Sequence, residues 1–293
     1  MTITQVVLVD QTHSIDTTLL HSAALALSSQ VSQDLPQYWS GITANVTVAP
    51  TLSAVPRGAW PVFLVKSLPP GEGGFHLDKH NQPFAKVIAS PDDESWTIDA
   101  SHEIVEMLVD PFGNRMQTSQ AIQISGKNVV DGSGTFHYLV EACDPCEANN
   151  FAYDLGGIAL SDFITPHFYD PSETPGTRYS FKGNLTRPRQ ILPGGYISYV
   201  QPDGSWNQIL WVDPNEGPTY KVPNVAAHLR SLREEIHRAM GPELDKAKHV
   251  QRRKEGGLPQ SVRARVAQHR AQREAKAKTD YEKVLRERYS IHE

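Results

Sequence analysis

The side chains best suited to chemistry lie in one short segment, DASHEIVEMLVD at residues 99–110. Apart from Ser101, its polar residues stand at positions 99, 102, 103, 106 and 110. These intervals place them in one stripe of a helix of 3.6 residues per turn, and the residues between them are apolar. A helix that buries most of its surface and aligns charged residues on one side faces a compensating charge or a cleft, because unpaired buried carboxylates are costly.

His102 and Glu106 are one helical turn apart, so both side chains can reach one metal ion. The His-Glu-x-x-His motif of zinc hydrolases uses this geometry, and here glutamate replaces the second histidine. Carboxylate oxygen is an acceptable zinc ligand. Glu103 would then be the general base for a zinc-bound water, whose pKa the metal lowers toward ~7. The alternative is an ion-paired or solvated helix face, since so short a motif often arises by chance.

The elements around this helix must position it. Hydrophobic patterns and turn residues predict a helix over 16–33 and a second over about 97–109, ended by Pro111. Strands are predicted at Val6–Val9, Asn45–Val48, Pro61–Lys66 and Phe84–Ala89, with a loop at Gly71–Gly74. This order favours a sheet with the last helix packed beneath it. Further strand candidates at 121–124, 135–142, 196–200 and 207–212 predict an irregular, strand-containing lower part.

Three segments carry a family resemblance: SHEIVEMLVDP at 101–111, VEACDPCE at 140–147 and SDFITPHF at 161–168. Together they resemble a widespread group of bacterial and phage proteins that are zinc metallopeptidase-like. The resemblance covers roughly residues 5–215. It implies an α+β zincin-like fold, with a twisted mixed sheet above the active-site helix, and bound Zn²⁺. In zincins the edge strand above the cleft immediately precedes that helix, which makes Phe84–Ala89 the expected edge strand for a peptide or protein substrate bound by strand addition.

A catalytic zinc site has three protein ligands and one water. Beyond His102 and Glu106, the best candidates are Glu141 and Asp144. Their pairing resembles gluzincin-like enzymes, which implies Glu141 as the third ligand and Asp144 as the group that orients the ligand histidine, although the two roles could be exchanged. Asp110 lies two turns beyond His102 and roughly 80° around the helix axis. It is expected to end the helix or to support a ligand.

Cys143 and Cys146 flank Asp144, and Glu147 is a weaker ligand candidate than Glu141. Two cysteines fall short of a four-cysteine zinc site, and a local disulfide would need an oxidising compartment. Small buried residues that shape the loop are the simpler interpretation of this pair.

Several other side chains could take part in catalysis, but no spacing pattern in the sequence selects among them. Packing or surface positions are expected for His76, His137 and His167 rather than metal ligation. Any of these, or Tyr153 or Tyr169, could polarise a substrate carbonyl.

Charge divides the 293-residue chain into two parts: residues 1–220 carry −13 and residues 221–293 carry +8, for a net charge of −5. The apolar fraction of 39% argues against disorder of the whole chain, and no collagen or rod pattern is present. No run approaches the ~20 apolar residues of a membrane span, so no membrane partner is expected. The first residues lack a signal-peptide pattern, which predicts a cytoplasmic protein, with a phage particle or secreted assembly as alternatives.

We therefore expect a zincin-like domain at 1–220, with an upper part of about 1–111 and a lower part of about 112–220. Residues 221–293 are predicted to form a basic helical extension. Its Lys and Arg run suggests nucleic-acid binding, but aromatic residues are few and acids interrupt it. Docking on the acidic body, self-association or assembly is favoured instead.

The leading hypothesis for the function is a zinc-dependent hydrolase, most specifically a peptidase with Glu103 as general base. The alternative is an inactive zincin-like structural or assembly protein, such as a phage or secreted particle component, whose basic tail mediates interactions. A nucleic-acid-associated protein is the third hypothesis.

Overall fold

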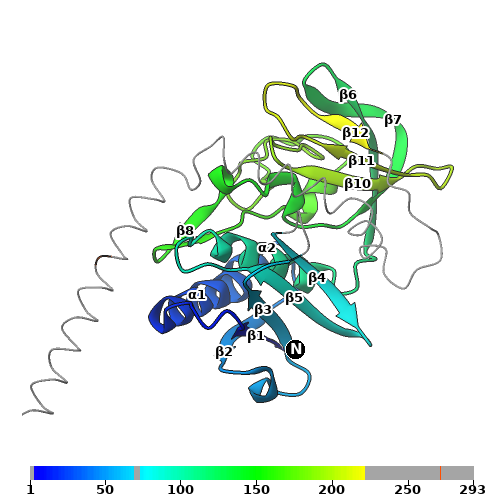
Figure 1. The fold of residues 1–293 in the computed structure, drawn as a ribbon. Coiled ribbons are helices and arrows are strands. Elements are labelled where there is room, and N and C mark those ends of the chain that lie inside the picture. The colour runs from blue at the N-terminus through cyan, green and yellow to red at the C-terminus, as the bar shows by residue number, and fades with distance from the viewer. Residues whose placement is uncertain (1–2, 69–72, 222–270, 272–293) are drawn as a thin grey trace, which may run out of the picture.

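The computed structural model describes residues 3–68, 73–221 and 271. Within these residues the fold is mixed α+β, as expected, and begins with a five-stranded sheet (Figure 1). The strand order is β2-β1-β3-β5-β4. The bounds are β1 (Thr4–Asp10), β2 (Ala44–Ala49), β3 (Trp60–Val65), β4 (Gly74–Lys79) and β5 (Gln82–Ile88). Neighbouring strands run parallel except for β4, which is antiparallel to β5.

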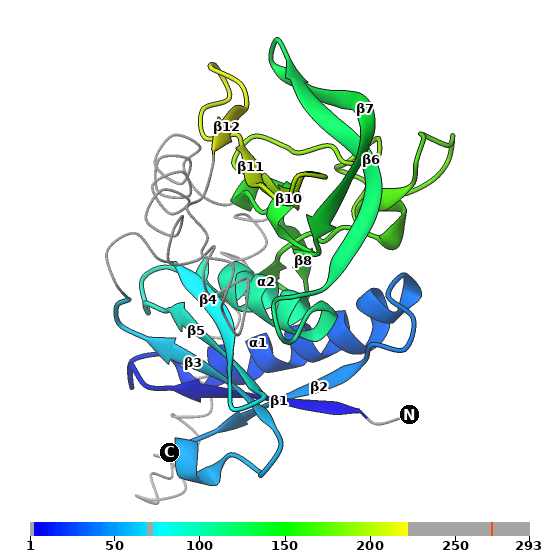
Figure 2. The same ribbon diagram turned by 90° about the vertical axis from the view of Figure 1, so that its right-hand side faces the viewer.

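Two helices lie between this sheet and the second half of the molecule (Figure 2). Helix α1 (Thr17–Ser29) is capped by Asp16, whose side chain accepts a hydrogen bond from the Leu19 amide at 2.9 Å. The helix predicted over 16–33 continues past α1 as a π-helical turn, η1 (Gln30–Asp34), and the 3-10 turn η2 (Leu35–Gln37). Helix α2 (Trp96–Val109) ends where Pro111 requires it to. None of the described helices is long and apolar enough to cross a membrane.

The prediction that Phe84–Ala89 is the edge strand is wrong. It corresponds to β5, which is paired with β3 on one side and with β4 on the other. The chain returns through a two-residue turn, His80-Asn81, in which both residues have positive φ, 56° and 60°. Two positive φ values define the tight turn that suits a hairpin, so the polar segment before it forms the additional strand β4 at the edge.

The second half is built on an antiparallel sheet of order β12-β11-β10-β7-β6. Its strands are β6 (Met116–Ser125), β7 (Asn128–Leu139), β10 (Tyr196–Val200), β11 (Trp206–Leu210) and β12 (Thr219–Lys221). A small hairpin, β8 (Tyr153–Leu155) with β9 (Ile158–Leu160), and short 3-10 turns complete it. The four predicted strand segments of this region all fall on or overlap these strands. Apart from residue 271, the predicted helices of the basic extension lie outside the described residues.

A network of buried hydrogen bonds joins α2 to two neighbouring segments. Ser101 Oγ donates to Gln30 Oε1 at 2.9 Å and accepts the Ser161 amide at 2.9 Å. Gln30 Nε2 donates to the Ser161 carbonyl at 3.0 Å. The turn after α1, helix α2 and the segment after β9 are thus joined by satisfied buried hydrogen bonds, which favours one position of α2.

Gly195 lies directly against the 3-10 turn η4 (Asp144–Cys146). A Cβ at this position would lie 2.6 Å from the carbonyl oxygens of both Asp144 and Pro145. We expect Gly195→Ala to lower the free energy of unfolding by about 1–3 kcal/mol, because the backbone must move to relieve the overlap. Denaturant unfolding measures this change. Gly132→Ala is the control, since its Cβ would meet only ordinary contacts from 3.6 Å, and equal stability of the two variants would contradict the expectation.

Candidate metal centre

Helix α2 carries its charged side chains into the interior. Every residue of α2 except Asp99 is buried, and His102, Glu103 and Glu106 face strand β4 and the segment that follows β7. The apolar remainder of the helix, such as Ile104, packs into the main core. The predicted arrangement, an apolar helix with one charged stripe, is confirmed.

The charged side chains of α2 belong to a buried cluster with His102 at its centre. Its members are His76, His102, Glu103, Glu106, Cys143, Asp144 and Glu147. The Nε2 atom of His102 is 3.2 Å from Glu106 Oε2 and 3.1 Å from Asp144 Oδ1, and the Nδ1 atom of His102 is 3.9 Å from Glu147 Oε2. Ligand atoms bound tetrahedrally to zinc at ordinary bond lengths are separated by roughly 3.3–3.6 Å. The first two separations are therefore close to those of atoms that share one ion.

Three groups of potential ligands have one atom from each residue within 4.8 Å of the others. They are His102 with Glu106 and Cys143, His102 with Asp144 and Glu147, and His76 with Glu103 and Glu106. All seven residues are buried. The two ligands predicted from the helix, His102 and Glu106, each belong to two of the groups, so the cluster is organised around them.

His76 belongs to the third group, whereas a packing or surface position was expected for it rather than metal ligation. Its Nδ1 atom lies 3.1 Å from Glu103 Oε2 and 3.7 Å from Glu106 Oε2. The neighbouring Gly74 allows β4 to approach the same carboxylate, since a Cβ there would lie 3.1 Å from Glu103 Oε1. Recognising Gly74–Lys79 as a strand paired to 82–88 would have placed His76 above α2. Strand β4 thus contacts Glu103 through His76 and passes close to its other oxygen at Gly74.

Three other carboxylates named from the sequence have different surroundings in the structure. Glu141 is buried, accepts a hydrogen bond from Ser198 Oγ at 3.3 Å, and belongs to none of the three groups found among the described residues. Asp110 accepts the Arg115 amide at 2.8 Å and closes the end of α2, as one of its two expected roles requires. Asp144 contacts His102 directly.

Both cysteines are buried and free. The Cys143 amide donates to Glu106 Oε1 at 3.1 Å, which fixes the orientation of that carboxylate. Burial raises the pKa of the Cys143 thiol well above its usual value, and the nearby Glu106 carboxylate raises it further. Burial, followed by the charge of Asp162, does the same for the pKa of the Cys146 thiol. The expected role as small buried residues therefore fits their surroundings.

The other candidates divide between surface and interior. His137 is exposed beside Thr118, and the His167 side chain is 54% exposed beside Asp170. Tyr153 donates to Asp34, away from the cluster. Tyr169 is the tyrosine near the cluster: burial raises its pKa well above the usual value, and the charge of Glu141 is the next cause.

The cluster contains more buried acid than buried base. Its carboxylates are Glu103, Glu106, Asp144 and Glu147. Across the described part of the chain, Arg189 is the only buried Lys or Arg, and its guanidinium bonds Asp131 Oδ1 at 2.8 Å instead. Carboxylates removed from water are costly, so a divalent cation would offset their charge.

The imidazole and carboxylate donors suit a divalent cation in general and do not by themselves select one. Comparisons with protein-family models, with curated proteins and with solved structures gave no match. The family resemblance of segments 101–111, 140–147 and 161–168 therefore stays a prediction from the sequence.

Proposed function

We propose that the chain is a zinc-dependent hydrolase that cleaves peptide bonds. The observation that carries the proposal is His102 Nε2 within 3.2 Å of two carboxylate oxygens, in a buried cluster with excess negative charge. Imidazole nitrogen with carboxylate oxygen is a donor set that zinc hydrolases use. The mixed sheet, its antiparallel edge strand β4 and the helix that carries His-Glu-x-x-Glu support a zincin-like arrangement.

His102 and Glu106 would hold the ion with one carboxylate from the segment after β7. Asp144 is favoured over Glu141 as the third ligand, because Asp144 Oδ1 lies 3.1 Å from His102 Nε2. This exchanges the roles that the resemblance implied. A bound zinc ion supplies a Lewis acid and a water of lowered pKa.

Glu103 acts as the general base. It adjoins the ligand His102 in sequence, and β4 orients its carboxylate through the contact of His76 Nδ1 at 3.1 Å. In this position Glu103 accepts a proton from the attacking water and returns it to the leaving amine, in the manner of an acid–base carboxylate. His76 keeps the carboxylate in that orientation.

The substrate lies along β4. β4 is the edge strand of the sheet within the described residues, and an edge strand is where an extended peptide adds by main-chain hydrogen bonds. A chain bound there passes the contact between His76 and Glu103.

Burial of the cluster favours a second candidate function, that of a zincin-like assembly protein without activity. Only 4% of His102 and 2% of Glu103 are exposed. Structural zinc sites are closed, whereas catalytic sites keep an open position. In this alternative the cation stabilises the fold and the basic extension binds the assembly partner.

Metal analysis tests the proposal. We expect about one zinc ion per purified full-length chain, as a mononuclear site requires. Chelation should lower the melting temperature and abolish cleavage of an unfolded protein substrate, and added zinc should restore both. Absence of bound metal at neutral pH would reject the metal centre, and bound zinc without cleavage would favour the assembly protein.

A further inference from the structure

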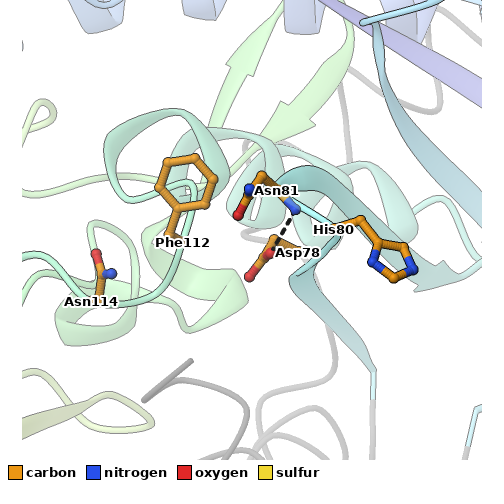
Figure 3. A pocket seen from close by; sticks show the side chains of 5 residues that line it. All are labelled: Asp78, His80, Asn81, Phe112 and Asn114. Atoms are coloured by element: carbon orange, nitrogen blue, oxygen red, sulfur yellow. Dashed lines mark hydrogen bonds between the residues drawn. The ribbon is translucent and has the colours of Figure 1, made fainter. Parts of the chain in front are cut away.

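A cavity of about 580 Å³ lies beside the far end of β4, outside the metal centre. The described residues that line it are Asp78, His80, Asn81, Phe112 and Asn114 (Figure 3). The first three belong to β4 and its turn, and the other two follow α2. Strand β4, which contacts Glu103, and the segment after α2 thus form this cavity.

The two walls of the cavity differ in structure. On one side, the positive-φ turn at His80-Asn81 is tied back by the Asn81 amide, which donates to Asp78 Oδ2 at 3.3 Å. On the other side, Phe112 follows the proline that ends α2 and keeps 40% of its surface exposed. The cavity is thus lined by both the Asp78 carboxylate and a partly exposed aromatic ring.

Along β4, the cavity lies next to the metal centre. Alternate residues of a strand point to the same face, so Asp78 shares the face of His76, about 7 Å further along. His76 contacts Glu103. A peptide bound along β4, with its cleaved bond beside Glu103, would therefore bring a nearby side chain to the cavity.

The lining has the chemistry of a cation site. It offers one carboxylate, one exposed aromatic ring, two amides and the imidazole of His80, and no Lys or Arg of the described residues lines it. A guanidinium can bond a carboxylate through two N–H groups and stack on an aromatic ring, whereas an ammonium makes a single point contact. We propose that this cavity binds a basic side chain of the peptide substrate, arginine in preference to lysine. The assignment rests on the proposed peptidase function.

Paired peptides that differ only in arginine or citrulline test the assignment, because citrulline is nearly the same shape but uncharged. Calorimetry would measure their binding to the zinc-loaded full chain carrying Glu103→Gln, in which turnover is slowed. We expect the arginine peptide to bind roughly tenfold more tightly, from one charge pair and one ring contact. Adding Asp78→Asn should reduce the difference to within about twofold, and Asp78→Glu should keep most of it.

Glu173→Gln is the matched control, since it removes one exposed acid outside the cavity and should leave the preference intact. Equal binding of the two peptides, or an unchanged preference in Asp78→Asn, would overturn the cavity assignment. Cleavage by the wild-type chain separates this from the parent proposal. Cleavage without arginine preference rejects the cavity site alone, whereas arginine preference in binding without any cleavage supports the site and rejects the peptidase.

Discussion

Glu103→Gln should retain zinc and lower the rate of peptide hydrolysis by about 10²–10⁴-fold, the usual contribution of a positioned general base. Glutamine keeps the size and the hydrogen-bonding capacity of the side chain, so the contact with His76 Nδ1 can persist. It cannot accept the proton of the attacking water. Steady-state kinetics on a fluorogenic peptide, together with zinc content, would measure the two effects separately.

Asp99→Asn is the matched control for this variant. Asp99 lies on α2 one turn before Glu103 but is only half-buried and belongs to none of the three groups of potential ligands in the described residues. Its replacement should leave kcat within a small factor of the wild-type value. Unchanged hydrolysis in Glu103→Gln would exclude Glu103 as the base. Loss of zinc in that variant would instead identify Glu103 as a ligand, through its group with His76 and Glu106.

The second large effect concerns metal retention. His102→Ala should reduce bound zinc from about one ion per chain to none, since His102 belongs to two of the three ligand groups. Glu106→Ala should have the same effect for the same reason. The stability that the ion contributes is lost with it, so both variants should melt at the temperature of the chelated wild type. Metal analysis and thermal unfolding on the same samples give both quantities.

The exposed His137→Ala is the control for nonspecific loss of a histidine. Full zinc occupancy in His102→Ala would refute the assigned centre. The pair Asp144→Asn and Glu141→Gln then identifies the third ligand. The contact of Asp144 with His102 leads us to expect zinc loss in the first variant and retention in the second.

Helix α2 could be predicted because the residues that determine it lie close together in the sequence. The intervals between His102, Glu103 and Glu106 define one helical face, and Pro111 determines where the helix ends. The same pattern identified three of the residues that the structure brings together. No knowledge of the rest of the fold was needed for them.

His76 could not be found in this way. Its strand, GFHLDK, mixes polar and apolar residues and becomes a strand only by pairing with β5. Asp144 was a candidate from the family resemblance, but its contact with His102 could not be derived from spacing, because its 3-10 turn has no period and is held by distant contacts. Leu192 donates to the Pro145 carbonyl at 2.9 Å, and Gly195 packs against the same turn. Long-range pairing of this kind cannot be derived from spacing along the chain.

The cluster draws on both halves of the molecule. Strand β4 and helix α2 contribute His76, His102, Glu103 and Glu106, whereas the segment after β7 contributes Asp144 and Glu147. A cation held by both would act as a cross-link between sequence-distant parts, and its binding energy would be shared by their folding. The two halves would then unfold as one cooperative unit when loaded. In the metal-free chain the two halves could open separately, and amide hydrogen exchange would report the opening of each half as its own step.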